Sequence, residues 1–185
     1  MTTHTKTVTN GVNMEALIAA VTAIQENPGK AKSKFRIRNK WISGARSRTT
    51  AQDFYTLGSE NTHMQHYEVE ADEPTVLGGS DAAPNPAEHL LGALATCVTT
   101  SIVAHGAVNG IPIEEVESQV EGDLDLHGFL GLNPNAQVGF QNIRISFKVK
   151  TAPENIAKLR ELAELSPIYK TISEATPVDL QIHHK

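Results

Sequence analysis

Apolar residues recur along the chain with two different periods, and each period predicts a different kind of element. A period near 3.6 residues predicts helices, which we place at 12–26, 86–108, 153–165 and 166–173. Strict alternation of apolar and polar residues predicts strands, which we place at 33–42, 45–56, 63–70, 113–124, 138–150 and 177–183. Strands before and after a long helix indicate an α+β fold.

The predicted helix at 86–108 has clear ends. Asn85 is a good N-cap, Pro86 suits the first helical position, and Glu88 stands three residues after the cap, as in a capping box. Gly110 provides a left-handed stop. Between these ends the helix is apolar on nearly all sides. Such a helix has to be covered all round, so we expect it at the centre of the fold or at a large interface.

Size and composition limit the class of protein. With 185 residues, of which 39 % are hydrophobic, the chain can fill the core of one domain. It has no run of about 18 uninterrupted apolar residues, as a membrane span would need, and its first residues lack the pattern of a signal peptide. We therefore expect a cytoplasmic protein that does not insert into a membrane.

The net charge of −5 weighs against nucleic acid as a partner. One basic stretch, between residues 30 and 48, is the exception. Its cations alternate with apolar residues, so it is better interpreted as the polar face of an amphipathic strand. Contact with RNA through this stretch stays an alternative hypothesis, which predicts strongly salt-dependent binding.

Cys97 is the single cysteine of the chain, and it lies within the apolar helix at 86–108. It cannot form a disulfide within the chain. A lone cysteine of this kind more often packs as a small hydrophobic residue than reacts. Its surroundings must decide between these two interpretations.

Those surroundings resemble the family of osmotically induced protein C and organic hydroperoxide resistance proteins (OsmC/Ohr). An Asn-Pro pair opens a helix of small residues, and Cys97 follows eleven residues after Pro86, as in the family's central signature. Further matching segments are Ala71-Asp72-Glu73-Pro74, Leu77-Gly78-Gly79, Gly110-Ile111 and Ser166-Pro167-Ile168. The resemblance covers about residues 33–184. It implies an OsmC-like domain at 33–185, preceded by an extension at 1–32 with one helix.

The resemblance also implies an architecture and a chemistry. The architecture is an OsmC-like fold, with strands flanking a long buried central helix, and an intertwined homodimer. In the chemistry, a thiolate attacks the distal oxygen of an organic hydroperoxide, and an arginine on an early strand and a glutamate at the helix start hold that thiolate. Cys97 matches the attacking cysteine, and Arg46 and Arg48 both match the arginine. The family needs no cofactor or metal, and we expect none here.

Two of the family's functional residues are missing. Ala87 stands where the family has its glutamate, and Ser166 stands where it has the second cysteine. Glu88 does not easily replace the glutamate, because nine residues of helix place it on the opposite side from Cys97 and about 14 Å along the axis. A serine cannot resolve a sulfenic acid. The resemblance therefore implies a one-cysteine peroxidase that uses an external thiol or reductase as its resolving partner.

A second hypothesis is a non-catalytic protein that binds a small apolar or lipid-like ligand. It is motivated by the missing glutamate and second cysteine. The connection between the two strands after the central helix carries Phe129, Leu130 and Leu132, more apolar side chains than a plain turn needs. These residues are candidates for a pocket lining. Gly78-Gly79 is a weaker candidate, for an anion-binding nest.

Overall fold

The computed structural model describes residues 8–184 and has a mixed α+β fold. The chain forms two compact units, Met1–Leu90 and Leu91–Lys185. No loop separates them, because the boundary falls inside helix α2 (Pro86–Val108). The expected boundary between an extension at 1–32 and a domain at 33–185 stays a prediction, and residues 1–7 of that extension lie outside the described residues.

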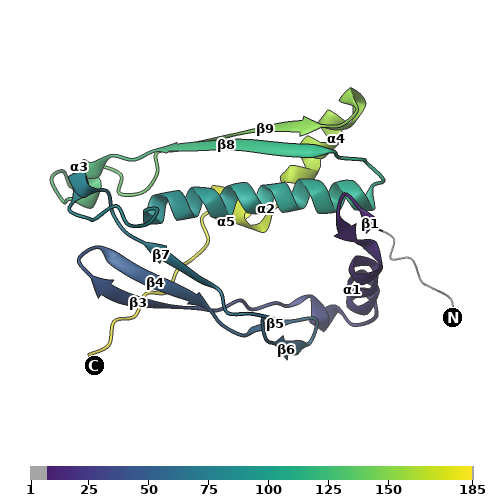
Figure 1. Cartoon of the computed structure of the whole chain (residues 1–185), viewed down its shortest axis with the longest axis horizontal. Helices are drawn as coiled ribbons and strands as arrows, with labels where there is room; N and C mark the ends of the chain where they lie inside the picture. The colour runs from purple at the N-terminus through teal and green to yellow at the C-terminus, as the bar shows by residue number, and fades with distance from the viewer. Residues whose placement is uncertain (1–7, 185) are drawn as a thin grey trace. The chain divides into compact units, whose positions relative to one another are not determined.

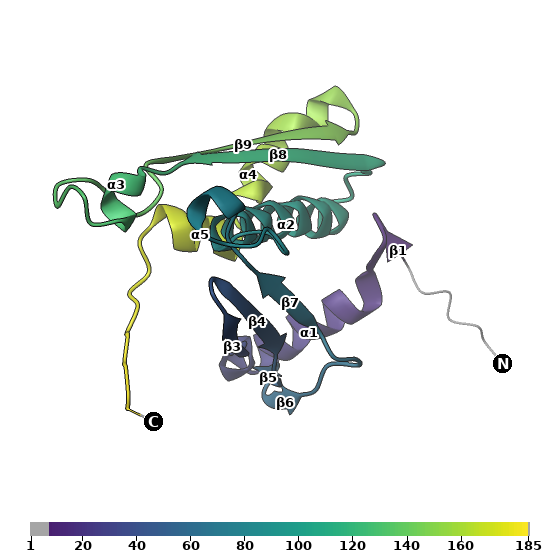
Figure 2. The same cartoon turned by 60° about the vertical axis from the view of Figure 1, so that its left-hand side comes forward.

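The first unit is built from short strands and one long helix. Its helical elements are α1 (Met14–Glu26), η1 (Pro28–Ala31) and η2 (Thr75–Leu77). Its strands are β1 (Val8–Thr9), β2 (Val12–Asn13), β3 (Ile37–Ser43), β4 (Arg46–Ala51), β5 (Phe54–Thr56), β6 (Ser59–Asn61) and β7 (Glu68–Ala71). Within the described part of this unit, β4 is the middle strand of the antiparallel sheet β3-β4-β7, and β1-β2 and β5-β6 are separate hairpins (Figure 2).

Two of the predicted strands in this unit are wrong in extent. The strand expected at 45–56 is interrupted at Gln52 and Asp53, which separates β4 from β5. Leu57 and Gly58, with positive φ angles of 51° and 88°, then form the turn between β5 and β6. The strand expected at 63–70 is reduced to β7, and Met64, ahead of it, is fully exposed. A Leu-Gly pair predicts a turn less strongly than Asn-Gly does, so the sequence pattern did not predict the β5-β6 hairpin.

The second unit contains most of α2 and a long hairpin. Its elements after α2 are β8 (Glu115–Asp123), α3 (Leu126–Phe129), β9 (Asn142–Lys150), η3 (Pro153–Asn155), α4 (Ile156–Ala163) and α5 (Pro167–Ser173). β8 and β9 pair antiparallel over nine residues each, from Glu115 opposite Lys150 to Asp123 opposite Asn142. Figure 1 shows this hairpin running along α2, with α4 and α5 beside the helix.

The apolar core lies in the second unit. Buried side chains of α2, the segment after it and α4 form one cluster, and Val120 of β8 and the alternating apolar residues of β9 pack against it. The buried members are Leu94, Val98, Ile102, Ile111, Leu159 and Leu162. The period of 3.6 in α2 and α4 and the period of two in β9 thus meet on one core, as the hydrophobic pattern requires.

The ends of α2 agree with the prediction. The Asn85 side chain accepts from the Glu88 N–H at 2.8 Å, and the Glu88 carboxylate accepts from the Asn85 N–H at 2.8 Å, which is a complete capping box. The helix begins at Pro86 and ends at Val108, and Gly110 has a φ of 68°. Local sequence signals are sufficient to define both ends.

The strand predicted at 177–183 does not form. After α5 the chain continues as an extended segment without secondary structure (Figure 2). Its alternating Val178, Leu180 and Ile182 are 87 %, 81 % and 88 % exposed. The alternation is that of a strand, but a strand needs a neighbouring edge, and none of the described sheets includes this segment.

Candidate functional site

Cys97 lies at the edge of the buried stripe of α2. On one side of Cys97 the helix is buried, at Leu94, Val98 and Ser101. On the other side it is exposed, at Thr96 and Thr100. Cys97 itself is half-buried and has a free thiol. The thiol is therefore neither sealed in the core nor placed on the open surface.

Threonines near Cys97 use their hydroxyl groups on the helix itself. Thr96 donates to the Gly92 carbonyl at 2.9 Å, Thr99 to the Ala95 carbonyl at 2.9 Å, and Thr100 to the Thr96 carbonyl at 3.0 Å. Each hydroxyl is satisfied in this way. The protons of these three hydroxyl groups are therefore donated within the helix itself.

Arg46 and Arg48 both bind the same carboxylate, that of Glu70 on β7. Arg46 donates from Nε and Nη2 to Glu70 Oε2, at 2.9 and 2.5 Å. Arg48 donates from Nε and Nη2 to Oε1, at 3.0 and 2.7 Å. Each oxygen of Glu70 thus accepts two hydrogen bonds from one guanidinium, an arrangement that orients both cations.

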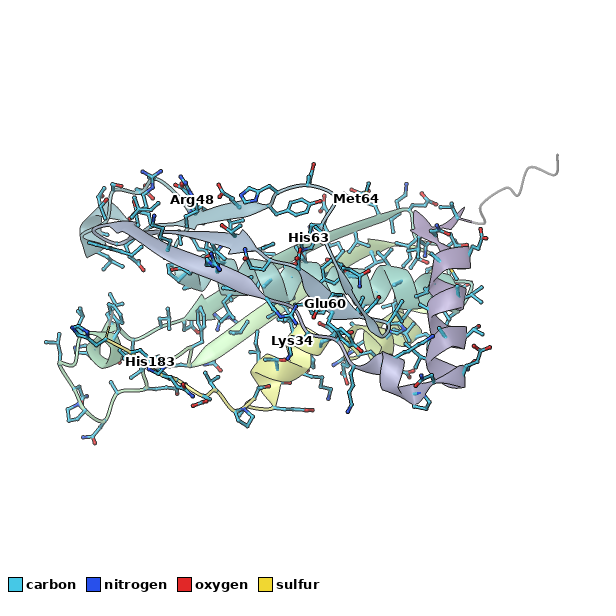
Figure 3. The ribbon with its side chains drawn as sticks, turned by 90° about the horizontal axis from the view of Figure 1, so that it is seen from below. Lys34, Arg48, Glu60, His63, Met64 and His183 are labelled. Atoms are coloured by element: carbon cyan, nitrogen blue, oxygen red, sulfur yellow. The ribbon has the colours of Figure 1, made fainter. Side chains whose placement is uncertain are left out.

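The sheet register explains this cluster. Arg48 stands directly opposite Glu70 on neighbouring strands, and Arg46, two residues earlier, shares the same face. Glu68 extends the network, since His66 lies 2.8 Å from it and Arg48 lies 3.8 Å from it. Figure 3 labels Arg48 on this part of the sheet.

The charges in this cluster reinforce one another. Hydrogen bonds from Arg48, and next from Arg46, hold the pKa of the Glu70 carboxyl below its usual range. The same pairing raises the pKa of Arg48. Glu70 therefore stays ionised at neutral pH, and together with Glu68 it balances the charges of Arg46 and Arg48. Sequence reasoning missed Glu70, because only the pairing of β4 with β7 brings it to the arginines.

The start of α2 is tied to the same strand. His89 Nε2 lies 2.9 Å from the Glu70 carbonyl oxygen. Ala87 has no carboxylate, and Glu88 is occupied in the capping box, as the sequence predicts. Within the Met1–Leu90 unit, the carboxylate that accepts hydrogen bonds from both Arg46 and Arg48 is thus that of Glu70 on β7, and no residue at the start of α2 takes this place.

The loop before α2 is organised by one buried carboxylate. Asp72, 1 % exposed, accepts hydrogen bonds from the Glu73 N–H, the Ser80 N–H, the Ser80 hydroxyl and the Ala82 N–H at 2.5–3.2 Å. The Ser80 hydroxyl, followed by these N–H groups, lowers the pKa of Asp72 to about 2. This carboxylate holds the loop closed ahead of Asn85.

The glycines of this loop have a structural role. Gly78 has a φ of 85°, and a Cβ on Gly79 would lie 1.8 Å from the Glu73 carbonyl oxygen. Their N–H groups donate to the carbonyls of Thr75 and Pro74, at 3.1 and 3.2 Å. The anion-nest interpretation is therefore wrong, because both donors are already used.

Ser166, at the position of the family's second cysteine, is completely buried. Its Oγ accepts from the Tyr169 N–H at 3.2 Å and caps α5. The serine thus satisfies a helix N-terminus, and it offers no thiol for a disulfide.

A shallow hollow of about 430 Å³ lies at the end of the β8–β9 hairpin. It is lined by Leu124, Asp125, Leu126, His127, Leu130, Leu132 and Gln141. Two of the three predicted pocket residues, Leu130 and Leu132, line it, whereas Phe129 is outside the lining and 72 % exposed. The Asp125 carboxylate lies 2.7 Å from His127 Nδ1 and supplies the polar part of the wall.

No cluster of three or more His, Cys, Asp or Glu residues that could hold a metal occurs within residues 8–184. His63 lies between the rings of Phe54 and Tyr67, with centroids 4.9 and 5.4 Å away. Over the same residues, α2 is the one helix long and apolar enough to cross a membrane, a test that the core helix of a soluble protein also passes.

Comparison with solved structures supports the fold. An OsmC-like protein from Mycoplasma pneumoniae superposes with a TM-score of 0.56 at 16 % identity, covering 77 % of this chain and 89 % of that chain. An organic hydroperoxide resistance protein OsmC from Legionella pneumophila gives 0.53 at 19 % identity, covering 76 % and 91 %. An OsmC-like protein of unknown function from Vibrio cholerae gives 0.56 at 14 % identity, covering 76 % and 94 %. No curated protein matches the sequence.

A match between the sequence and a family model identifies the family of this chain. The model of the OsmC-like protein family matches residues 78–181, which include the loop before α2, Cys97, the β8–β9 hairpin and α5. This match spans more than half of the 185 residues and agrees with the fold of the solved structures. The chain therefore belongs to the OsmC-like family.

Proposed function

We propose that this OsmC-like protein reduces organic hydroperoxides with the thiol of Cys97. The observation that carries the proposal is the half-buried free thiol at the edge of the buried stripe of α2. A reactive thiol needs partial shielding from water together with access for a substrate, and this position provides both. The solved structure from Legionella pneumophila is named a hydroperoxide resistance protein, which agrees with this chemistry.

The reaction begins with the Cys97 thiolate. Its sulfur attacks the distal oxygen of the hydroperoxide, the O–O bond breaks, and the alkoxide takes a proton and leaves as an alcohol. The sulfur is oxidised to a sulfenic acid and the peroxide is reduced to the alcohol.

Arg46 and Arg48 are assigned to the thiolate by resemblance to the family. A guanidinium keeps its charge when partly buried and favours the thiolate over the thiol. Glu70 binds both guanidinium groups and orients them together, so both arginines are assigned this role.

The cycle is completed by an external thiol. Ser166 caps α5 and cannot form a disulfide with Cys97. A first external thiol therefore condenses with the sulfenic acid, releasing water and forming a mixed disulfide. A second thiol, or a reductase, then reduces that disulfide and restores Cys97.

We place this activity in a cytoplasmic homodimer. α2 is apolar on nearly all sides, yet only a third of its most apolar 18-residue window is buried within the chain. Its exposed side carries small residues such as Gly92, Ala93 and Thr96. Apolar surface of this kind is stabilised when a second copy covers it.

The experiment treats reduced protein with cumene hydroperoxide and traps sulfenic acid with a dimedone probe, read by mass spectrometry. We expect one adduct, on Cys97, and consumption of peroxide when a low-molecular-weight thiol is added. Cys97→Ser is the control and should give neither result. A Cys97 that stays unmodified at millimolar peroxide would overturn the proposed activity.

A second candidate function is binding of an apolar ligand in the hollow beside α3. Four leucines and a histidine hydrogen-bonded to Asp125 line it, which suits an apolar molecule with one polar group. Native mass spectrometry of freshly purified protein tests this idea. A bound ligand that is lost in Leu130→Asp supports it, and an empty protein contradicts it.

A further inference from the structure

His89 links the start of α2 to strand β7. Its ring is half-buried, and Nε2 lies 2.9 Å from the Glu70 carbonyl oxygen. A carbonyl oxygen can only accept a hydrogen bond, so Nε2 has to carry the proton. The neutral ring is thereby fixed in the tautomer protonated at Nε2, and the charged ring carries the same proton. The link therefore does not depend on the ionisation of His89.

The register of the sheet shows why the Glu70 carbonyl needs a partner from outside the sheet. The Ala51 N–H donates to the Tyr67 carbonyl at 3.0 Å, so these two residues form a hydrogen-bonded pair. Such pairs alternate along antiparallel strands with pairs that have no hydrogen bonds, and three positions further on Arg48 and Glu70 form one of the latter. The backbone of Glu70 therefore points away from β4, toward the outer edge of the described sheet.

The bond from His89 satisfies this outward carbonyl and attaches the end of β7 to the helix. A half-buried carbonyl without a partner is unfavourable, so the contact is held in place. A second bond lies close to it along the chain, because the Asp72 N–H donates to the Pro84 carbonyl at 3.4 Å. The end of β7 is thus attached to the chain on both sides of Asn85, the N-cap of α2.

The side chain of Glu70 serves the arginines while its backbone is held by the helix. Its carboxylate accepts hydrogen bonds from Arg46 and Arg48 at 2.5–3.0 Å. A continuous path of hydrogen bonds therefore runs from α2 through His89 and Glu70 to the two cations. All of these residues belong to the Met1–Leu90 unit.

No neighbour at the helix start can replace His89 in this path. Glu88 closes the capping box with Asn85, and Ala87 has no polar group. Among the described side chains of residues 86–90, that of His89 is the one that bonds to β7. Cys97 follows on the same helix eight residues later, or about two turns. The helix that carries the thiol thus holds the strand that carries the carboxylate.

We propose that His89 is a positioning residue for the proposed peroxide reduction. Its Nε2–H holds Glu70, and thereby both arginines, in the orientation that favours the Cys97 thiolate. The inference rests on the proposed function, since it takes the roles of the arginines and of Cys97 from there. It adds a residue that acts through Glu70 and needs no contact with the thiol.

The test measures how fast iodoacetamide alkylates Cys97 at neutral pH, followed by mass spectrometry of the intact protein. Cys97 is the single cysteine of the chain, so the signal belongs to one residue. His89→Leu removes the donor and should slow alkylation roughly tenfold, because the arginines lose their orientation. His89→Gln offers an amide N–H at the reach of Nε2 and should keep most of the wild-type rate. His89→Asn reaches only as far as Nδ1 and should resemble His89→Leu.

His105→Leu is the matched control. His105 is also half-buried on α2, but it lies in the last turn, about 24 Å along the axis from His89. The same substitution there should leave the alkylation rate unchanged. The melting temperature of every variant is measured as well, so that a general loss of the fold is detected.

A double-mutant cycle separates positioning from a purely structural role. In Glu70→Gln the arginines have already lost their carboxylate, so adding His89→Leu should slow alkylation little further. The melting temperature should fall in both backgrounds, because the backbone carbonyl of residue 70 loses its donor in each. Effects on the alkylation rate that multiply independently would overturn the inference.

The outcomes separate the inference from the proposed function. Equal rates for the wild type and His89→Leu overturn the positioning role, and so does a His89→Gln variant as slow as His89→Leu. A faster reaction in His89→Leu shows that the thiol has become more accessible and also overturns it. Sulfenic acid formation with cumene hydroperoxide is measured separately on the wild type. Its absence overturns the proposed peroxidase, whereas the alkylation series decides whether His89 acts on the thiol through Glu70.

Discussion

The two units of this protein are stabilised in different ways. All the buried apolar side chains in the described residues lie after Leu90, on α2, the segment after it and α4. The described part of the first unit has one buried residue, Asp72, and it is charged. Its main sheet is held by backbone pairing and by ion pairs around Glu70, while Phe35, Ile37 and Trp41 stay exposed. The comparison shows that one unit has a core and the other has polar networks and uncovered apolar surface.

The difference bears on assembly. A sheet without a buried face gains little from the hydrophobic effect, and small units of this kind usually need a partner surface. The arginines of the proposed function, Arg46 and Arg48, lie in the first unit, and Cys97 lies in the second. Substitutions confined to one unit therefore separate the contribution of core packing to stability from that of the polar networks.

The largest effect should come from the core of the second unit. Leu159→Ala removes a side chain that is 3 % exposed and packed in the main cluster. We expect a loss of about 2–5 kcal/mol in the free energy of unfolding, from lost burial and the cavity left behind. Leu165→Ala, at a leucine 55 % exposed, is the matched control and should cost far less. Chemical denaturation measures both, and equal losses would contradict a core at α4.

The next effect should come from the buried carboxylate of the first unit. In Asp72→Asn an amide NH₂ would face the N–H groups of Ser80 or Ala82, donor against donor, so the loop before α2 would loosen. We expect the melting temperature at pH 7 to fall by roughly 5 °C or more. Ser80→Ala, which removes one of the four donors, should have a smaller effect.

The same residue predicts a pH dependence. The pKa of Asp72 is lowered from 3.8 to about 2, so the unfolded state binds the proton more readily. The contribution of Asp72 to stability is therefore complete above about pH 4 and is lost as the pH falls through 2. Acid titration of unfolding should show a larger loss over this range in the wild type than in Asp72→Asn, in which only the other carboxylates, such as Glu70, still titrate. A wild-type stability that is flat over this range would contradict it.

A functional effect should come from Glu70. Glu70→Gln removes the carboxylate that both arginines bind and should lower the rate of peroxide reduction roughly tenfold, since small displacements of positioning groups are costly. The rate at which Cys97 is alkylated at neutral pH should fall as well, because the arginines are no longer oriented. Glu68→Gln is the matched control on the same strand, because the Glu68 carboxylate lies 3.8 Å from Arg48 Nε, beyond hydrogen-bond distance. If both variants react like the wild type, Glu70 has no part in the thiol chemistry.

The smallest effect should come from an exposed ion pair of the second unit. Lys158 and Glu161, three residues apart on α4, lie 2.8 Å from each other with both side chains more than half exposed. Glu161→Gln should change the free energy of unfolding by no more than about 0.5 kcal/mol, because solvent screens such pairs. A loss comparable to that of Leu159→Ala would show that surface charge, rather than the core, holds this unit.

Much of the fold could be predicted where local signals agree. The helix ends at Pro86 and Val108 follow from a capping box and a glycine stop, and α5 follows from a serine cap before a proline. The prediction failed where an element depends on its neighbours. The strand expected at 45–56 is divided at Gln52 and Asp53 into β4 and β5, and the one expected at 177–183 has no partner edge among the described sheets.

By itself, the sequence determined the family signature, the position of Cys97 in α2 and the fact that Arg46 and Arg48 share one face of a strand. These features depend on residue identity and on periods of 3.6 and two, which are local properties. Only the tertiary structure decided that Glu70 is the carboxylate on both arginines and that Asp72 holds the loop before α2. The physical reason is that these partners meet through strand register and loop closure, and a sequence period carries no information about which segments pair.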